Sequence, residues 1–211
     1  MLARATAFGL LGLLTGAGVP VDHGPAPIRL VLTASAAAAP ASTLAATSLS
    51  WSHDPWRRYL ASDRVCPGAE RTDLPPRRQA ASVACLVNFA RRERGLARLA
   101  TVGILNRASA RKAAAIRRCE RFAHNPCGGN WTASIRSTGY LGSFGENLYL
   151  ASGPLAAPRR AVDAWLHSAP HRENLFRTSW RDQGLALVIL PLFEQDRNVA
   201  VWVSVLGDQP T

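Results

Sequence analysis

Two histidines and one glutamate from separate parts of the sequence, His124, Glu146 and His171, are the side chains best suited to chemistry. Two neutral imidazoles and one carboxylate could hold Zn²⁺ with an open fourth position, where a bound water would have a pKa near 7. In the alternative, Glu146 pairs with one or both imidazoles, raises their pKa values and fixes the surrounding structure through hydrogen bonds. We favour the metal-free alternative and expect any divalent cation, such as zinc, to bind weakly.

Ser168, three residues before His171, permits a second kind of chemistry. Ser168 would be the nucleophile, His171 its base and Glu146 the acid that orients the base. No Gly-x-Ser-x-Gly elbow surrounds Ser168, and the sequence identifies no donor for an oxyanion hole. In the structural alternative, Ser168 ends a helix before Pro170 and satisfies a terminal backbone group.

Helical and strand periodicities predict the elements that position these side chains. Apolar residues at helical spacing indicate three amphipathic helices, and apolar runs indicate three strands, of which the last two form an antiparallel hairpin. The predicted helices are residues 78–94, a stripe from 105 to 119 and a segment after 158, and the predicted strands are 145–150, 184–192 and 198–206. No βαβ unit repeats, so the sequence predicts an α+β domain with helices packed on an antiparallel sheet.

Four cysteines favour an oxidising compartment. They allow three pairings, and we prefer Cys66–Cys85 with Cys119–Cys127 because each of these bridges closes a short loop. The second loop encloses His124. A metal site of four thiolates is the weaker interpretation, since no Cys-x-x-Cys spacing is present.

The first 50 residues differ in composition from the rest of the chain. An apolar stretch at residues 5–19 follows Arg4 and suits a signal peptide better than a membrane span, and small residues at 34–38 offer cleavage sites. We predict a signal peptide or leader at residues 1–39, a low-complexity linker and N-terminal arm at 40–65, and the folded domain at 66–208. We expect the protein to be secreted or extracellular, and this includes association with the cell wall or the membrane. An uncleaved leader would then serve as the membrane anchor.

Lys and Arg number 25 against 14 Asp and Glu, which gives a formal net charge of +11. Such a charge attracts anionic lipid or acidic cell-wall polymer, although it could also serve only to keep the protein soluble. The arginines are scattered and form no basic run interleaved with aromatic residues, so we expect no nucleic-acid partner. The length is that of one domain with some chain to spare, which argues against a multidomain enzyme, and we expect a monomer. No dinucleotide-binding loop, P-loop or zinc finger is present in the sequence.

In their order and separations, the segments that carry these residues resemble the bacterial branch of the CAP superfamily, also called SCP-like. This superfamily includes cysteine-rich secretory proteins, insect antigen 5 and plant pathogenesis-related proteins. The resemblance covers roughly residues 80–207. Its motifs are Leu86-Val87-Asn88, Phe122-x-His124, Gly139-Tyr140, Gly145-Glu146-Asn147-Leu148, Trp165-x-x-Ser168-x-x-His171-Arg172-x-Asn174-Leu175, Gln183-Gly184-Leu185-Ala186 and Trp202-Val203.

The resemblance implies a three-layer α-β-α sandwich. In many members of this superfamily two His and two Glu line a central cleft that can hold a divalent cation. His124, His171 and Glu146 match three of these positions, whereas the fourth falls on Ser168, so one carboxylate is missing. The resemblance therefore implies a secreted, non-catalytic binding module for lipid, sterol or cell-wall polymer with a His-Glu-His cleft. The alternative is a metal-assisted or serine-type hydrolase acting in the same cleft.

Overall fold

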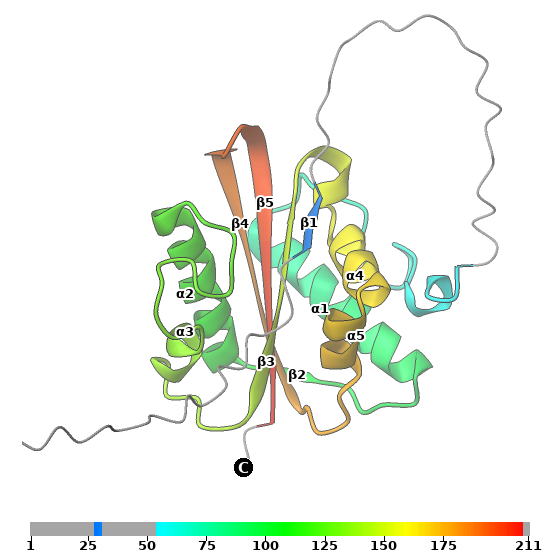
Figure 1. Cartoon of the computed structure of the whole chain (residues 1–211). Coiled ribbons are helices and arrows are strands. Elements are labelled where there is room, and N and C mark those ends of the chain that lie inside the picture. The colour runs from blue at the N-terminus through cyan, green and yellow to red at the C-terminus, as the bar shows by residue number, and fades with distance from the viewer. Residues whose placement is uncertain (1–27, 31–53, 209–211) are drawn as a thin grey trace, which may run out of the picture.

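A five-stranded mixed sheet forms the centre of the molecule in a computed structural model, which describes residues 28–30 and 54–208 (Figure 1). The strand order is β1-β3-β5-β4-β2. The central strand β5 runs antiparallel to both of its long neighbours, β3 and β4, and two short edge strands add parallel pairs, β1 with β3 and β2 with β4. The strands are β1 Ile28–Leu30, β2 Ala100–Thr101, β3 Phe144–Ala151, β4 Asp182–Phe193 and β5 Asp196–Gly207.

Helices cover both faces of this sheet. Figure 1 shows α2 and α3 on one face and α1, α4 and α5 on the other. The α-helices are α1 Pro76–Glu93, α2 Gly103–Cys119, α3 Ala133–Arg136, α4 Pro158–His167 and α5 Ala169–Phe176, and short 3₁₀ turns occupy Arg57–Tyr59 and Gly153–Ala156. The predicted α+β class is confirmed. None of the helices in the described ranges is both long and apolar enough to cross a membrane.

The sheet separates two apolar clusters. Alternation along β5 sends Trp202 and Leu206 into the cluster under α1 and α4, and Val203 into the cluster under α2. Because both faces of β5 are covered, its sequence reads as a continuous apolar run rather than as an alternating one. The close approach of α2 depends on Gly184 of β4, where a Cβ atom would overlap the backbone of Leu105 and Asn106.

The principal predicted elements agree with the structure. Helices predicted at 78–94 and 105–119 and after residue 158 correspond to α1, α2 and α4, and the three predicted strands correspond to β3, β4 and β5. The hairpin turn is shorter than the predicted 193–197, because Phe193 pairs with Asp196 and leaves two residues between them. The edge strands, α3 and α5 were not predicted.

Both preferred disulfides are confirmed. Cys66–Cys85 joins the segment before α1 to α1 itself, and Cys119–Cys127 joins the end of α2 to the loop that carries His124. The part of the predicted arm from residue 54 onward packs on the domain: Tyr59 is buried in the core, and Arg172 lies over the ring of Trp56 at 4.2 Å. The predicted leader and the rest of the linker lie outside the described residues, apart from β1.

Candidate functional site

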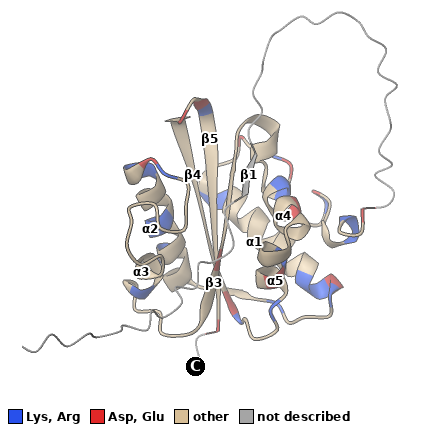
Figure 2. Ribbon diagram, in the orientation of Figure 1, with Lys and Arg blue, Asp and Glu red and all other residues tan. Residues whose placement is uncertain are grey.

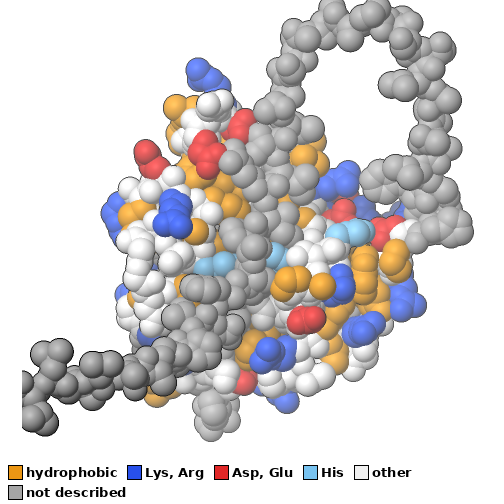
Figure 3. Space-filling model, in the orientation of Figure 1, with side chains coloured by type: hydrophobic (Ala, Val, Ile, Leu, Met, Phe, Trp, Pro, Cys, Tyr) orange, Lys and Arg blue, Asp and Glu red, His pale blue; other side chains and the backbone are white. Residues whose placement is uncertain are grey.

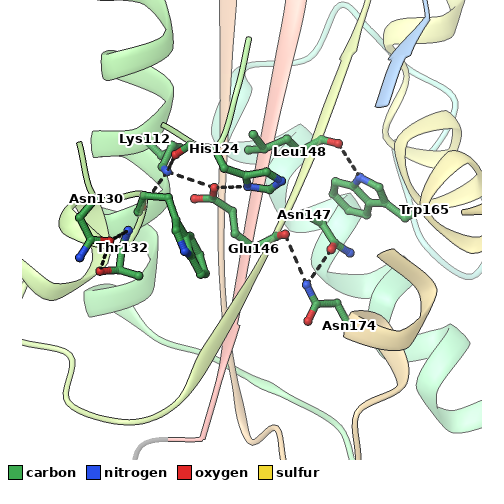
Figure 4. Close-up of polar contacts among 10 residues, drawn as sticks. Lys112, His124, Asn130, Thr132, Glu146, Asn147, Leu148, Trp165 and Asn174 are labelled. Carbon is green, nitrogen blue, oxygen red and sulfur yellow. Dashed lines mark hydrogen bonds and ion pairs between the residues drawn. The ribbon is translucent and has the colours of Figure 1, made fainter. Parts of the chain in front are cut away.

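A buried ion pair joins α2 to β3 at the predicted site (Figure 4). Oε1 of Glu146 accepts a hydrogen bond from Nδ1 of His124 at 2.7 Å and lies 3.1 Å from Nζ of Lys112. The side chains of Glu146 and Lys112 are only 0% and 3% exposed, so solvent screens their attraction very little. The same carboxylate oxygen of Glu146 therefore contacts both the His124 imidazole and the Lys112 ammonium group.

Lys112 is the only lysine in the sequence, and α2 directs it into the interior. Its ammonium group donates to the backbone carbonyls of His124 and Trp131, in addition to its contact with Glu146. Three acceptors match the three N–H donors of a lysine, so the burial cost of this charge is offset by a complete set of partners. The loop after α2 is thus held at one end by the Cys119–Cys127 bridge and along its length by Lys112.

An amide network on the other face of β3 holds α5. Asn147 donates to the backbone carbonyl of His171 at 3.0 Å, and Asn174 donates to Oδ1 of Asn147 at 3.0 Å. A Cβ atom at Gly145 would overlap the amide of Asn174, which explains the glycine. Trp165 of α4 donates to the carbonyl of Leu148 at 3.1 Å. The Gly-Glu-Asn-Leu motif therefore holds α4 and α5 through hydrogen bonds and also supplies the Glu146 carboxylate.

His171 contacts Ser168 and not Glu146. Its Nδ1 lies 2.7 Å from Oγ of Ser168, and its buried Nε2 has no hydrogen-bond partner among the described residues. Burial, with a smaller contribution from the charge of nearby His124, lowers the pKa of His171 to about 4, so the ring is neutral at neutral pH. Ser168 ends α4 and precedes α5, as the structural alternative expected: its backbone N–H donates to the carbonyl of Trp165 and its carbonyl accepts from the amide of Arg172, whereas its hydroxyl makes no helix cap.

The three predicted ligands come from elements on two sides of β3, and their ligand atoms do not all lie within 4.8 Å of one another. Side chains alternate along β3, and Leu148 belongs to the cluster under α2 whereas Tyr149 belongs to the cluster under α1 and α4. By the same alternation, Glu146 faces the side of α2 together with His124, whereas Asn147 faces the side where α5 carries His171. The imidazoles therefore reach β3 from opposite sides of the sheet.

This arrangement does not fit the divalent cation that the resemblance implies. An ion bound by Glu146 would lie beside the Lys112 ammonium, and like charges repel strongly where water is excluded. Within residues 28–30 and 54–208, the only three acidic or histidine side chains with ligand atoms all within 4.8 Å of one another are Asp54, Asp163 and His167. His167 lies 3.1 Å from each of these carboxylates and joins the arm to α4 as an ion-paired bridge.

Lys112, Asn147 and Asn174 were missed as functional candidates. Lys112 does carry a signal in the sequence, because it follows Ala108 by four residues and so lies on the apolar stripe of the predicted second helix. A single lysine on a buried stripe indicates a paired internal charge. The two asparagines lie within the quoted family motifs, but spacing alone does not show which backbone groups they bind.

The comparisons with known proteins identify the fold. No family model matches the sequence, and no curated protein matches it. Among solved structures, a cysteine-rich secretory protein from Staphylococcus aureus is similar over 64% of this chain, with 13% identity and a TM-score of 0.52. An extracellular protein containing an SCP domain from Bacillus anthracis is similar over 64% of this chain, with 16% identity and a TM-score of 0.51.

The chain has a CAP-like fold. The similar region makes up 40% and 44% of the lengths of these two proteins, so the chain spans less than half of each.

Replacement of Lys112 tests the buried ion pair. Lys112→Met keeps the length of the side chain but leaves Glu146 as a buried charge without its ammonium partner. We expect the free energy of unfolding in urea to fall by about 3 to 5 kcal/mol. The double variant Lys112→Met/Glu146→Gln should recover a large part of this loss, because it removes both charges. Strictly additive losses would show that the two groups do not interact.

The low pKa of His171 makes the stability depend on pH in a defined window. Between pH 6.5 and about 4, the unfolded chain binds a proton at this residue whereas the folded protein does not. The contribution is complete above pH 6.5 and is lost as the pH falls, at about 1.4 kcal/mol per pH unit, or about 3 kcal/mol in total. Urea unfolding of wild type and His171→Gln at both ends of the window should show this difference, and equal pH slopes for the two proteins would contradict it.

Proposed function

We propose that this protein is an exported binding protein with a CAP fold, whose ligand is an anionic component of the cell envelope, either an acidic polymer or a lipid headgroup. The region of His124, Glu146 and His171 then serves as the structural centre of a binding domain and not as a hydrolytic centre. The contact between Lys112 and Glu146 is the single observation that carries this distinction.

A hydrolytic role would require Glu146 to face a reacting water or to orient a base. Instead, Oε1 of Glu146 is engaged by both Lys112 and His124, and the side chain is fully buried. His171, the second candidate base, is on the other side of β3 and contacts Ser168. A carboxylate held in this way stabilises β3 and the loop after α2, and this structural role is compatible with a binding protein.

Two observations support export. The disulfides Cys66–Cys85 and Cys119–Cys127 are typical of proteins that fold in oxidising compartments. The two similar structures are described as a secretory protein and as an extracellular protein. The apolar stretch near the N-terminus, which suits a signal peptide, agrees with both.

The charge of the surface supports an anionic ligand. The Lys and Arg positions coloured in Figure 2 lie mostly on helices and connecting loops, and Figure 3 shows their side chains spread over the visible face without one dominant patch. On α2, Arg111, Arg117 and Arg118 are exposed. A spread of positive charge fits a repeating anionic surface better than it fits one small anion, and it gives no reason to expect binding of a neutral sterol.

Binding to anionic surfaces should be strong at low salt and weak at high salt. Vesicles containing phosphatidylglycerol, vesicles of phosphatidylcholine alone and a soluble polyphosphate polymer distinguish lipid from polymer as the anionic source in a co-sedimentation or anisotropy assay. We expect binding to at least one anionic probe to fall about tenfold or more between about 0.05 M and 0.5 M salt. Arg117→Gln/Arg118→Gln should weaken it, whereas Arg92→Gln, which removes an arginine already paired with Glu93, should have less effect. Equal binding to neutral and anionic vesicles would contradict the proposal.

A serine-type hydrolase is the second candidate, because Oγ of Ser168 lies 2.7 Å from Nδ1 of a neutral His171. A neutral imidazole can accept the hydroxyl proton. However, Glu146 does not orient this base, and Nε2 of His171 has no partner among the described residues. We therefore expect a fluorophosphonate probe to leave the folded protein unlabelled. Labelling that disappears in Ser168→Ala, or a hydrolytic activity that a chelator abolishes, would establish an enzyme instead.

A further inference from the structure

A groove opens at the sheet edge farthest from β3, between α1 and α2. It has a volume of about 860 Å³, within the usual range for ligand sites. Since α1 and α2 cover opposite faces of the sheet, they form the two walls, and β4 lies between them (Figure 1). The residues that line it are Pro76, Arg77, Ala80, Ala81, Ala84, Cys85, Asn88, Arg98, Thr101, Asn106, Arg107, Ala110, Leu185, Ala186 and Leu187.

The outer edge of β4 is open along this groove. The neighbouring strand β2 pairs only with Asp182 and Gln183, and no other described strand continues the ladder. The amide of Leu185 donates to the side chain of Asn106, away from β5. Because backbone groups alternate in direction along a strand, the N–H and C=O groups of Leu187 and Ile189 point to the same outer side. These groups are available to pair with another extended chain.

The open stretch has defined limits. At its beginning, Asn106 already satisfies the amide of Leu185. At its far end is Pro191, which falls in the same alternation and has no N–H to offer. A proline at an edge is a common way to stop further strand pairing. The edge thus offers donors at Leu187 and Ile189 and no donor at the next outward position.

The walls and rim of the groove indicate the kind of chain that fits. Alanines at 80, 81, 84 and 110 leave room for the side chains of an added strand. Arg77 on α1, Arg98 before β2 and Arg107 on α2 supply positive charge, and no Asp or Glu of the described ranges lines the groove. None of these three arginines forms an ion pair with a described residue. The positive charges on the two walls of the groove therefore complement acidic side chains of an added strand.

We propose that this groove binds an extended acidic peptide segment, which adds to the outer edge of β4 as a further strand. Backbone hydrogen bonds to Leu187 and Ile189 supply affinity that is independent of sequence, and the arginines select for acidic side chains. This site lies on the opposite sheet edge from the His124 and Glu146 region and does not depend on the proposed envelope ligand.

A synthetic peptide tests the proposal directly. The probe is a fluorescent octapeptide of alternating valine and glutamate, and binding is followed by fluorescence anisotropy with the full chain. Two control peptides separate the contributions: one has lysine in place of glutamate, and the other is N-methylated at alternate amides. We expect the glutamate peptide to bind at least about tenfold more tightly than either control. No binding of the glutamate peptide, or equal binding of the N-methylated peptide, would overturn the proposal.

Matched variants locate the site. Leu187→Pro removes an outward N–H without removing a bond to β5, whereas Leu187→Val keeps that N–H, so only the former should weaken binding, by about tenfold. Arg77→Gln/Arg107→Gln should weaken binding about three- to tenfold, whereas Arg92→Gln, which lies on α1 outside the groove and is paired with Glu93, should not. Circular dichroism checks that each variant is folded, and the N-methylated peptide tests strand addition if Leu187→Pro is not. Self-association of the wild type that Leu187→Pro abolishes would assign the edge to a second copy and overturn the peptide proposal.

Discussion

The buried ammonium group of Lys112 is the interaction on which the arrangement around β3 depends. A charge in the interior is tolerated only with a full set of partners, and here these are a carboxylate on β3 and two carbonyls from the loop after α2. The loop after α2 must therefore stay close to α2, and the Cys119–Cys127 bridge constrains the loop in the same way. The position of the Glu146 carboxylate is fixed by this lysine as much as by His124.

Alternation along β3 explains why residues that resemble one site form two. Glu146 and Asn147 are neighbours in the chain, but they face opposite sides of the sheet: the first belongs to an ion-paired cluster with α2, the second to an amide network that holds α5. His124 and His171 are members of these separate groups. The charge of one histidine still lowers the pKa of the other, so the two groups are linked electrostatically and not through a shared ligand.

Most of the fold could be predicted because its main elements have clear periodicity, as in α1, α2 and the β4–β5 hairpin, and the disulfides followed from short loops. The helix α5 could not, since residues 169–176 have no apolar stripe and are held instead by Asn147 and Asn174. Edge strands of two or three residues carry no pattern to detect. For the candidate site, residue types predicted the contact between Glu146 and His124, but the partner of His171 depends on which side of β3 each loop reaches.

The short strand β1 has a consequence for maturation. Ile28–Leu30 pair with Tyr149–Ala151 of β3, and these three residues precede the small-residue positions 34–38 that suit a signal peptidase. Cleavage there would detach β1 from the domain and leave the outer backbone of β3 without its neighbour. The edge strand on this side of the sheet would then be β1 in the precursor and β3 in the processed protein. Removal of the leader would therefore create a new open strand edge next to the Gly-Glu-Asn-Leu motif.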